Sequence, residues 1–134
     1  MKNILAATLF AALLSLASCG RRDASPPTVK AGDVSARIGY FASHGWEAEE
    51  ISERAVTIPT VFSEAYERYA VMQDRQGLPL RSFAGRDAQL FVYEIKNYSP
   101  ENKRMLAELL VCDDTAAASA IYSEDGTSIL MPVS

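Results

Sequence analysis

The chain has little of the material from which catalytic and metal sites are usually built. Its 134 residues include one histidine, His44, and two cysteines, Cys19 and Cys112. No Gly-x-Ser-x-Gly, Cys-x-x-Cys or phosphate-loop motif occurs. The sequence therefore favours a protein that is not an enzyme, with no catalytic residues, no cofactor and no bound metal. A pair of carboxylates brought together by the fold stays open as a catalytic alternative.

The chain also lacks a cluster of basic residues. The chain has thirteen Lys and Arg residues and seventeen Asp and Glu residues, which gives a formal net charge of −4. Proteins that bind nucleic acids neutralise phosphates with clustered Lys and Arg, and no such stripe occurs here. We therefore expect no nucleic-acid partner.

The only long apolar run lies at the N-terminus. Lys2 precedes residues 4–16, which are apolar except for Thr8 and Ser15, and the small residues Ala17 and Ser18 follow them. This layout is typical of a secretory signal peptide. The run is shorter than the roughly 20 apolar residues that a membrane-spanning helix needs.

Leu16-Ala17-Ser18-Cys19 resembles the lipobox of bacterial lipoprotein signal peptides. The resemblance implies cleavage between Ser18 and Cys19 and attachment of a diacylglyceryl group, with fatty acyl chains such as palmitate, to Cys19. The protein would then be held by this anchor at the extracytoplasmic face of the cell membrane, since two acyl chains give stable anchoring. An ordinary signal peptide with a chance cysteine and an uncleaved anchor are the alternatives.

Three segments follow from this interpretation. Residues 1–18 form the signal peptide, 19–32 form the lipidated cysteine and a flexible tether, and 33–134 form a single domain. A lipidated Cys19 leaves Cys112 without a disulfide partner. Because Cys112 ends an apolar run, we expect it to be a small buried residue.

Apolar spacing predicts two helices in the first half of the domain. The first spans 33–44, with Asp33 as its N-cap and Gly45 as the left-handed residue after it. The second spans 60–76, opened by Pro59 and ended by Gly77. Between them we expect an irregular connection with a short extended stretch at 55–58.

Alternating apolar residues and turn signals predict strands in the second half. The expected strands are 89–97, 104–112, 117–122 and 127–131. Short turns between them require antiparallel pairing. We therefore predict an α+β fold in which two helices pack on one face of a roughly four-stranded antiparallel meander sheet.

An ordered set of short motifs runs through the domain. It comprises Gly45-Trp46, the segment 58–62 (Ile-Pro-Thr-Val-Phe), Gln73 to Gly77, and Asn97-Tyr98. Together these resemble the domain of unknown function 4830 family of small bacterial extracytoplasmic proteins. The resemblance covers about residues 34–131, and it implies domain boundaries but no activity.

Few residues stand out as candidates for ligand contact. His44-Gly45-Trp46 is typical of a helix end, although Trp46 could contact a ligand. Tyr98 is the tyrosine most expected to be exposed, because it lies beside a proline-containing turn. An acidic stretch is expected to be a solvated connection rather than a calcium site; its members are Glu47, Glu49, Glu50 and Glu53.

These observations lead to three hypotheses of function. The first is a membrane-anchored lipoprotein whose module binds an unknown protein, peptide or envelope component without catalysis. The second is an envelope hydrolase, which needs a pocket lined by at least two carboxylates with shifted pKa values. The third is an accessory subunit of a membrane complex, which needs an exposed apolar patch.

Overall fold

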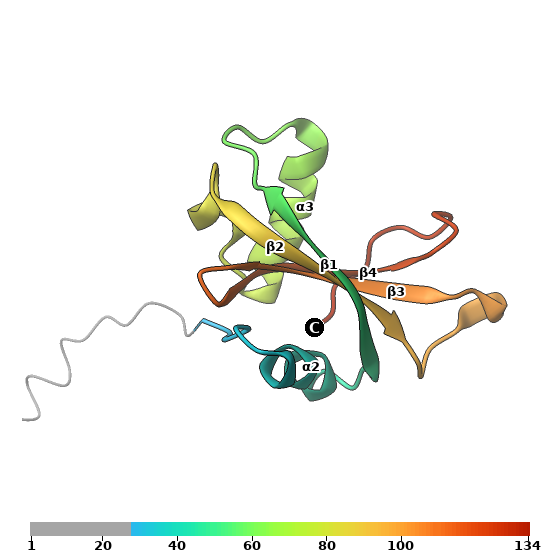
Figure 1. Ribbon diagram of the computed structural model, residues 1–134. Coiled ribbons are helices and arrows are strands. Elements are labelled where there is room, and N and C mark those ends of the chain that lie inside the picture. The colour runs from blue at the N-terminus through green and yellow to red at the C-terminus, as the bar shows by residue number, and fades with distance from the viewer. Residues whose placement is uncertain (1–27) are drawn as a thin grey trace, which may run out of the picture.

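The computed structural model describes residues 28–134. The predicted signal peptide, its cleavage point between Ser18 and Cys19, and the lipid site at Cys19 lie outside the described residues. Two helices and four strands follow in the order α2 (Val34–Ser43), β1 (Ala48–Thr57), α3 (Glu64–Gln76), β2 (Asp87–Ile95), β3 (Met105–Cys112) and β4 (Thr115–Ser123) (Figure 1). Short 3-10 turns occupy Leu80–Phe83 and Pro100–Asn102.

The four strands form one antiparallel sheet in the order β1-β2-β3-β4. The predicted α+β class and meander sheet are therefore confirmed. The hairpin between β3 and β4 turns through Asp113 and Asp114, which adopt φ values of 51° and 58°. Two consecutive residues at positive φ match the right-handed twist of the flanking strands, which explains the tight turn.

The helices cover opposite faces of the sheet, whereas one shared face was predicted (Figure 1). Successive side chains of a strand point to opposite faces. Phe91 and Tyr93 of β2 therefore pack with Phe41 of α2 in one apolar cluster, while Leu110 of β3 packs with Ala70 of α3 in another. Each helix has its own apolar stripe, and β2, β3 and β4 carry apolar residues on both faces. The two helical stripes therefore pack against two different surfaces of the sheet.

The first helix lies where the sequence predicts it. The Asp33 side chain accepts a hydrogen bond from the Ala36 amide at 2.8 Å, and His44 is the C-cap. Gly45 follows with a φ of 87°, a conformation that glycine adopts without steric cost.

The second helix begins later than predicted, at Glu64 rather than at residue 60. The Ser63 hydroxyl accepts a hydrogen bond from the Tyr66 amide and caps the first turn, so residues 59–62 form an irregular lead-in. The end is as predicted, because Gly77 closes the helix with a φ of 75°.

Two strand predictions were wrong. Residues 48–57 form the complete edge strand β1 instead of an irregular connection, and 127–131 form no strand beyond a single bridge between Ile121 and Met131. β1 is held by backbone pairing with β2, and most of its side chains are exposed, so it carries no alternating apolar pattern.

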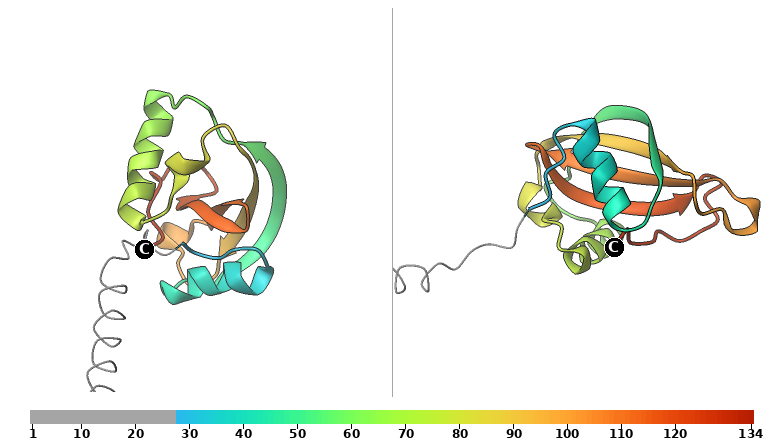
Figure 2. Two further views of the ribbon diagram at one scale, coloured as in Figure 1. Left: turned by 90° about the vertical axis from the view of Figure 1, so that its left-hand side faces the viewer. Right: turned by 90° about the horizontal axis from the view of Figure 1, so that it is seen from below.

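The outer edge of β4 is closed by three different segments. Lys30 bridges to Thr115, Met131 pairs with Ile121 through two 2.8 Å bonds, and the Gln73 amide pairs with the backbone of Ser119. The chain then ends between α2 and α3 (Figure 2), where Gln76 accepts a hydrogen bond from the Val133 amide. Closing this edge removes a surface on which another strand could pair.

None of the helices within residues 28–134 is long and apolar enough to cross a membrane.

Candidate functional site

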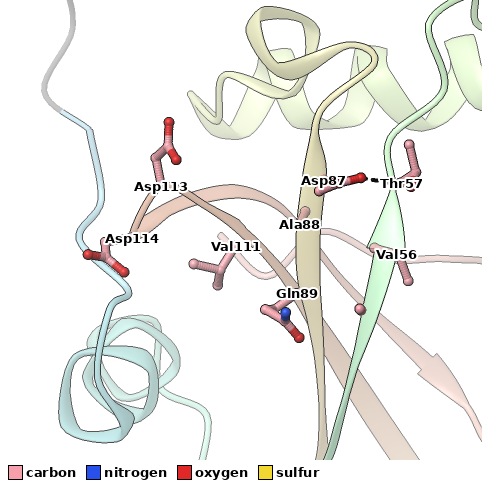
Figure 3. Close-up of a pocket in the computed structure, with 9 residues that line it drawn as sticks. Val56, Thr57, Asp87, Ala88, Gln89, Val111, Asp113 and Asp114 are labelled. Carbon is pink, nitrogen blue, oxygen red and sulfur yellow. Dashed lines mark hydrogen bonds between the residues drawn. The ribbon is translucent and has the colours of Figure 1, made fainter.

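Two hollows of the described domain compete as the functional site. The larger is a wide hollow of about 820 Å³ at the end of the sheet where β1 stops and β2 starts (Figure 3). It contains three carboxylates, those of Asp87, Asp113 and Asp114.

Two of the three carboxylates of this hollow, those of Asp87 and Asp113, have partners in local structure. Asp87 accepts a hydrogen bond from the Thr57 hydroxyl at 3.0 Å (Figure 3), and Asp113 forms an ion pair with Arg86. The backbone carbonyl of Asp114 accepts a bond from the Ala31 amide, which ties the β3–β4 turn to the segment before α2. No group of three metal-ligating side chains suited to a metal ion occurs in residues 28–134. These two carboxylates therefore stabilise the turn and the hairpin that form the hollow.

The second hollow is a mainly apolar pocket of about 480 Å³ between α3 and the sheet. We call it the Glu108 pocket, after the one acidic residue among those that line it. Its wall consists of β1 and the segment after it, α3, one residue each of β2 and the C-terminal segment, and two of β3: Val56, Thr57, Ile58, Pro59, Ser63, Ala65, Tyr66, Tyr69, Leu90, Glu108, Leu110 and Leu130.

The geometry of the fold explains why these residues meet. Tyr66 and Tyr69 are three positions apart on α3 and share its sheet-facing side, with ring centroids 5.6 Å apart. On β3, Glu108 and Leu110 are two positions apart and point to the same face of the sheet. A charged residue thus occupies a position on β3 that faces the second helix.

Glu108 lies in surroundings that disfavour its charge. Burial raises the pKa of the Glu108 carboxyl above its usual range, while the hydrogen bond from Tyr69 and the positive charge of Arg54 offset part of this rise. The Tyr69 hydroxyl donates to Glu108 Oε2 at 2.8 Å. Burial, and after it the nearby Glu108 charge, raises the pKa of Tyr69 well above its usual value. Tyr69 therefore remains a hydrogen-bond donor at neutral pH.

Two further tyrosines respond to the same carboxylate. Burial first and the Glu108 charge second raise the pKa of Tyr66 on α3 and of Tyr122 on β4. Within residues 28–134, only Tyr69 donates a hydrogen bond to the Glu108 carboxyl. Oε1 is thus left for a group that enters the pocket.

A second buried polar cluster, on the α2 face, contrasts with the Glu108 pocket. Arg37 donates from Nε to Glu50 Oε1 at 2.8 Å, and the Tyr93 hydroxyl donates to the same oxygen at 2.8 Å. The Arg37 guanidinium also donates to the Ala31 carbonyl and lies 3.8 Å from the centre of the Phe91 ring. Burial favours a higher pKa for Glu50, but the bonds from Arg37 and Tyr93 outweigh it and lower the pKa. Here both carboxylate oxygens of Glu50 accept hydrogen bonds from Arg37, so the cluster serves the fold.

The structure brings together the two predicted ligand-contact residues, and one of them, Trp46, also has a structural role. The rings of Trp46 and Tyr98 lie edge to face with centroids 5.7 Å apart. Trp46 Nε1 donates to the Val133 carbonyl at 2.8 Å and so fastens the C-terminal segment. Tyr98 is 38% exposed and lies beside Trp46, away from the Glu108 pocket.

Cys112 is buried, as predicted, and its Sγ lies 3.4 Å from the Asp87 carbonyl. Burial raises the pKa of this thiol, and the thiolate is therefore disfavoured. Glu47, Glu49 and Glu53 are exposed, whereas Glu50 joins the ion pair with Arg37.

Sequence reasoning missed Glu108. The available signal was a single charge inside the otherwise apolar run 106–111, where Glu108 lies between Ala107 and Leu109. A charged side chain at the centre of a strand covered on both faces has to find a partner or a pocket.

No protein-family model, curated protein or solved structure matches the chain. The resemblance to the domain of unknown function 4830 family therefore stays a prediction from the sequence, and the candidate site depends on its geometry alone.

Proposed function

We propose that the protein is a lipid-anchored envelope lipoprotein whose domain binds an apolar group of an envelope component in the Glu108 pocket. The lipobox-like segment ending at Cys19 supports the anchor and the extracytoplasmic location. The binding role is supported by one observation, a mainly apolar pocket of about 480 Å³ with a single carboxylate residue among those that line it. Pockets of this size and character are the usual form of small-ligand sites.

The rim of the pocket fits this role. Leu130, one of the lining residues, is 45% exposed, and its neighbour Ile129 is 83% exposed. Val61 is 84% exposed and lies in sequence between two lining residues, Pro59 and Ser63. Apolar side chains exposed beside an apolar pocket enlarge the surface that a ligand removes from water on binding.

The hydrolase alternative finds no support in this pocket. A mechanism with two carboxylates needs a second acidic group near the first, and Glu108 is the only acidic residue among those that line the pocket. We therefore favour binding over catalysis.

The proposal is tested with 1-hexanol, a neutral probe with an apolar chain and a hydroxyl that can donate to Glu108. The full chain is placed in phospholipid nanodiscs and titrated while the leucine methyl signals are followed by NMR. We expect saturable shifts at Leu90 and Leu110, and none at Leu109, which points to the opposite face.

A matched pair of variants locates the binding. Ala65 lines the pocket and is exposed, so Ala65→Phe narrows the pocket without entering the core. Ala42→Phe makes the same change at an exposed position of α2. We expect Ala65→Phe to abolish the shifts and Ala42→Phe to retain them. Equal shifts in both variants, or none in the native chain, would contradict the proposal.

A further inference from the structure

The Glu108 pocket has an apolar wall and an anionic group with one free oxygen, and this combination selects one ligand chemistry. Resting on the proposed function, we infer that the pocket takes an aliphatic ammonium group, with its methylene chain along the apolar wall and its nitrogen at Glu108. Glu108 Oε2 already accepts from Tyr69, so Oε1 is the acceptor for the incoming cation.

The wall suits the methylene chain. Leu90 and Leu110 extend from the floor of the pocket, Val56 lies on the β1 side, and the Tyr66 ring lies on the α3 side. Methylene groups gain free energy by leaving water against such side chains. An ammonium group near the face of a tyrosine ring gains further attraction from the electrons of the ring.

The charge balance favours a cation over an anion. The ionisable groups that face Glu108 are Tyr66 and Tyr69 from α3, Tyr122 from β4 and Arg54 from β1. The tyrosines are neutral donors, so Arg54 is the one cation of this set, and it is exposed to solvent, which screens its charge. A half-buried carboxylate without a close ion partner gains from a ligand that supplies the opposite charge.

The first turn of α3 does not reverse this preference. The N-terminus of a helix attracts anions, and Ser63 places this end at the wall of the pocket. Its positive end is compensated, because the Ser63 hydroxyl caps the Tyr66 amide and two acidic residues, Glu64 and Glu67, lie in the first turn.

The test compares n-hexylamine with 1-hexanol, which share a chain and differ in charge. Both are titrated into the full chain in nanodiscs under mildly alkaline conditions, where an alkylammonium remains charged because its pKa resembles that of lysine, about 10.4. We expect n-hexylamine to bind at least about ten-fold more tightly, with shifts at Leu90 and Leu110, since one charge-assisted hydrogen bond accounts for a factor of this size.

Glu108→Gln keeps the shape of the side chain and removes its charge, so it should bring the two affinities within about two-fold of each other. Glu53→Gln removes one charge from an exposed position of β1 on the opposite face and should leave the preference intact. Mild acid should reduce the preference in the native chain, because protonation of Glu108 removes its charge.

Two sources can supply this group, a small aliphatic amine or the lysine side chain of a partner protein. Nα-acetyl-lysine N-methylamide distinguishes them: binding as tight as that of n-hexylamine indicates a lysine, and much weaker binding indicates a small amine. Equal binding of n-hexylamine and 1-hexanol by the native chain would overturn the inference and leave the proposed function standing. If neither probe shifts the signals of Leu90 and Leu110, both the inference and the proposed function are wrong.

Discussion

The clearest test of the fold is Gln73, a buried polar residue that replaces a strand partner at the edge of β4. Its side chain is completely buried. Its Oε1 accepts from the Ser119 amide at 2.9 Å, and its Nε2 donates to the Ser119 carbonyl at 3.0 Å. We predict that Gln73→Met, which keeps most of the side-chain volume, lowers the free energy of unfolding.

The size of the expected loss in unfolding free energy follows from the hydrogen bonds that the partners of Gln73 keep in the variant. The Ser119 carbonyl also accepts from Gln76 Nε2 at 3.0 Å, so it remains bonded in the variant. The Ser119 amide loses its acceptor, and a buried unpaired amide costs about 1–3 kcal/mol. Gln76 Nε2 also loses its bond to Gln73 Oε1, which contributes about 1 kcal/mol. The expected loss is therefore about 2–4 kcal/mol.

Urea unfolding of the purified chain measures this loss, with the fluorescence of Trp46, the only tryptophan, as the signal. Hydrogen exchange of the Ser119 amide should accelerate at the same time. Gln89→Met, at an exposed position of β2, is the control and should stay within about 0.5 kcal/mol of the native chain. A Gln73→Met variant as stable as this control, with a protected Ser119 amide, would refute the argument.

Three further predictions concern charge and anchoring. Because the pKa of Glu108 is raised in the fold, the stability of the native chain falls as pH rises from about 4.3 through the pKa of Glu108 in the folded state. Above that pH window Glu108→Gln should be more stable than the native chain, and in stronger acid it should show no gain. Urea unfolding across pH measures this difference. The pKa of Glu50 is lowered, so its stabilisation is present above about pH 4.3 and disappears as pH falls through the folded value. Glu50→Gln should cost about 2–4 kcal/mol at neutral pH, since it leaves the Arg37 charge nearly buried, and equal stability of variant and native chain there would contradict this. Cys19→Ala should abolish membrane retention of the processed protein in cell fractionation, and a variant that still matures and sediments with membranes would show that Cys19 is not the anchor.

The elements that the sequence predicted correctly are those whose apolar residues recur at a regular spacing. Both helices, β2 and β3 carry apolar residues at the spacing of their structure, and the glycines at 45 and 77 end the helices. β1 is an edge strand with exposed, mostly polar side chains, so only its pairing with β2 defines it. The distribution of the helices over two faces depends on which residues of β2 and β3 point each way, and apolar runs on both faces leave that choice to the packing.

Sequence patterns could not predict the candidate site for a similar reason. Trp46 and Tyr98 stand out as residue types, yet the structure uses Trp46 to fasten the C-terminus. Glu108 stands out only once the neighbours of β3 are known, because its character depends on burial against Tyr69 of α3. The pairing of a helix with a strand 39 positions away creates this environment.

The most direct measurement is the pKa of the Glu108 carboxyl itself, obtained from its side-chain ¹³C signal in the full chain, without ligand and with saturating n-hexylamine. We predict a value above the ordinary glutamate pKa of about 4.3 in the free protein and a clear fall when the amine is bound, because the bound cation favours the ionised form. A carboxyl that titrates at the ordinary value and does not respond to the amine would contradict both the desolvated state of Glu108 and its role as the acceptor of an ammonium group.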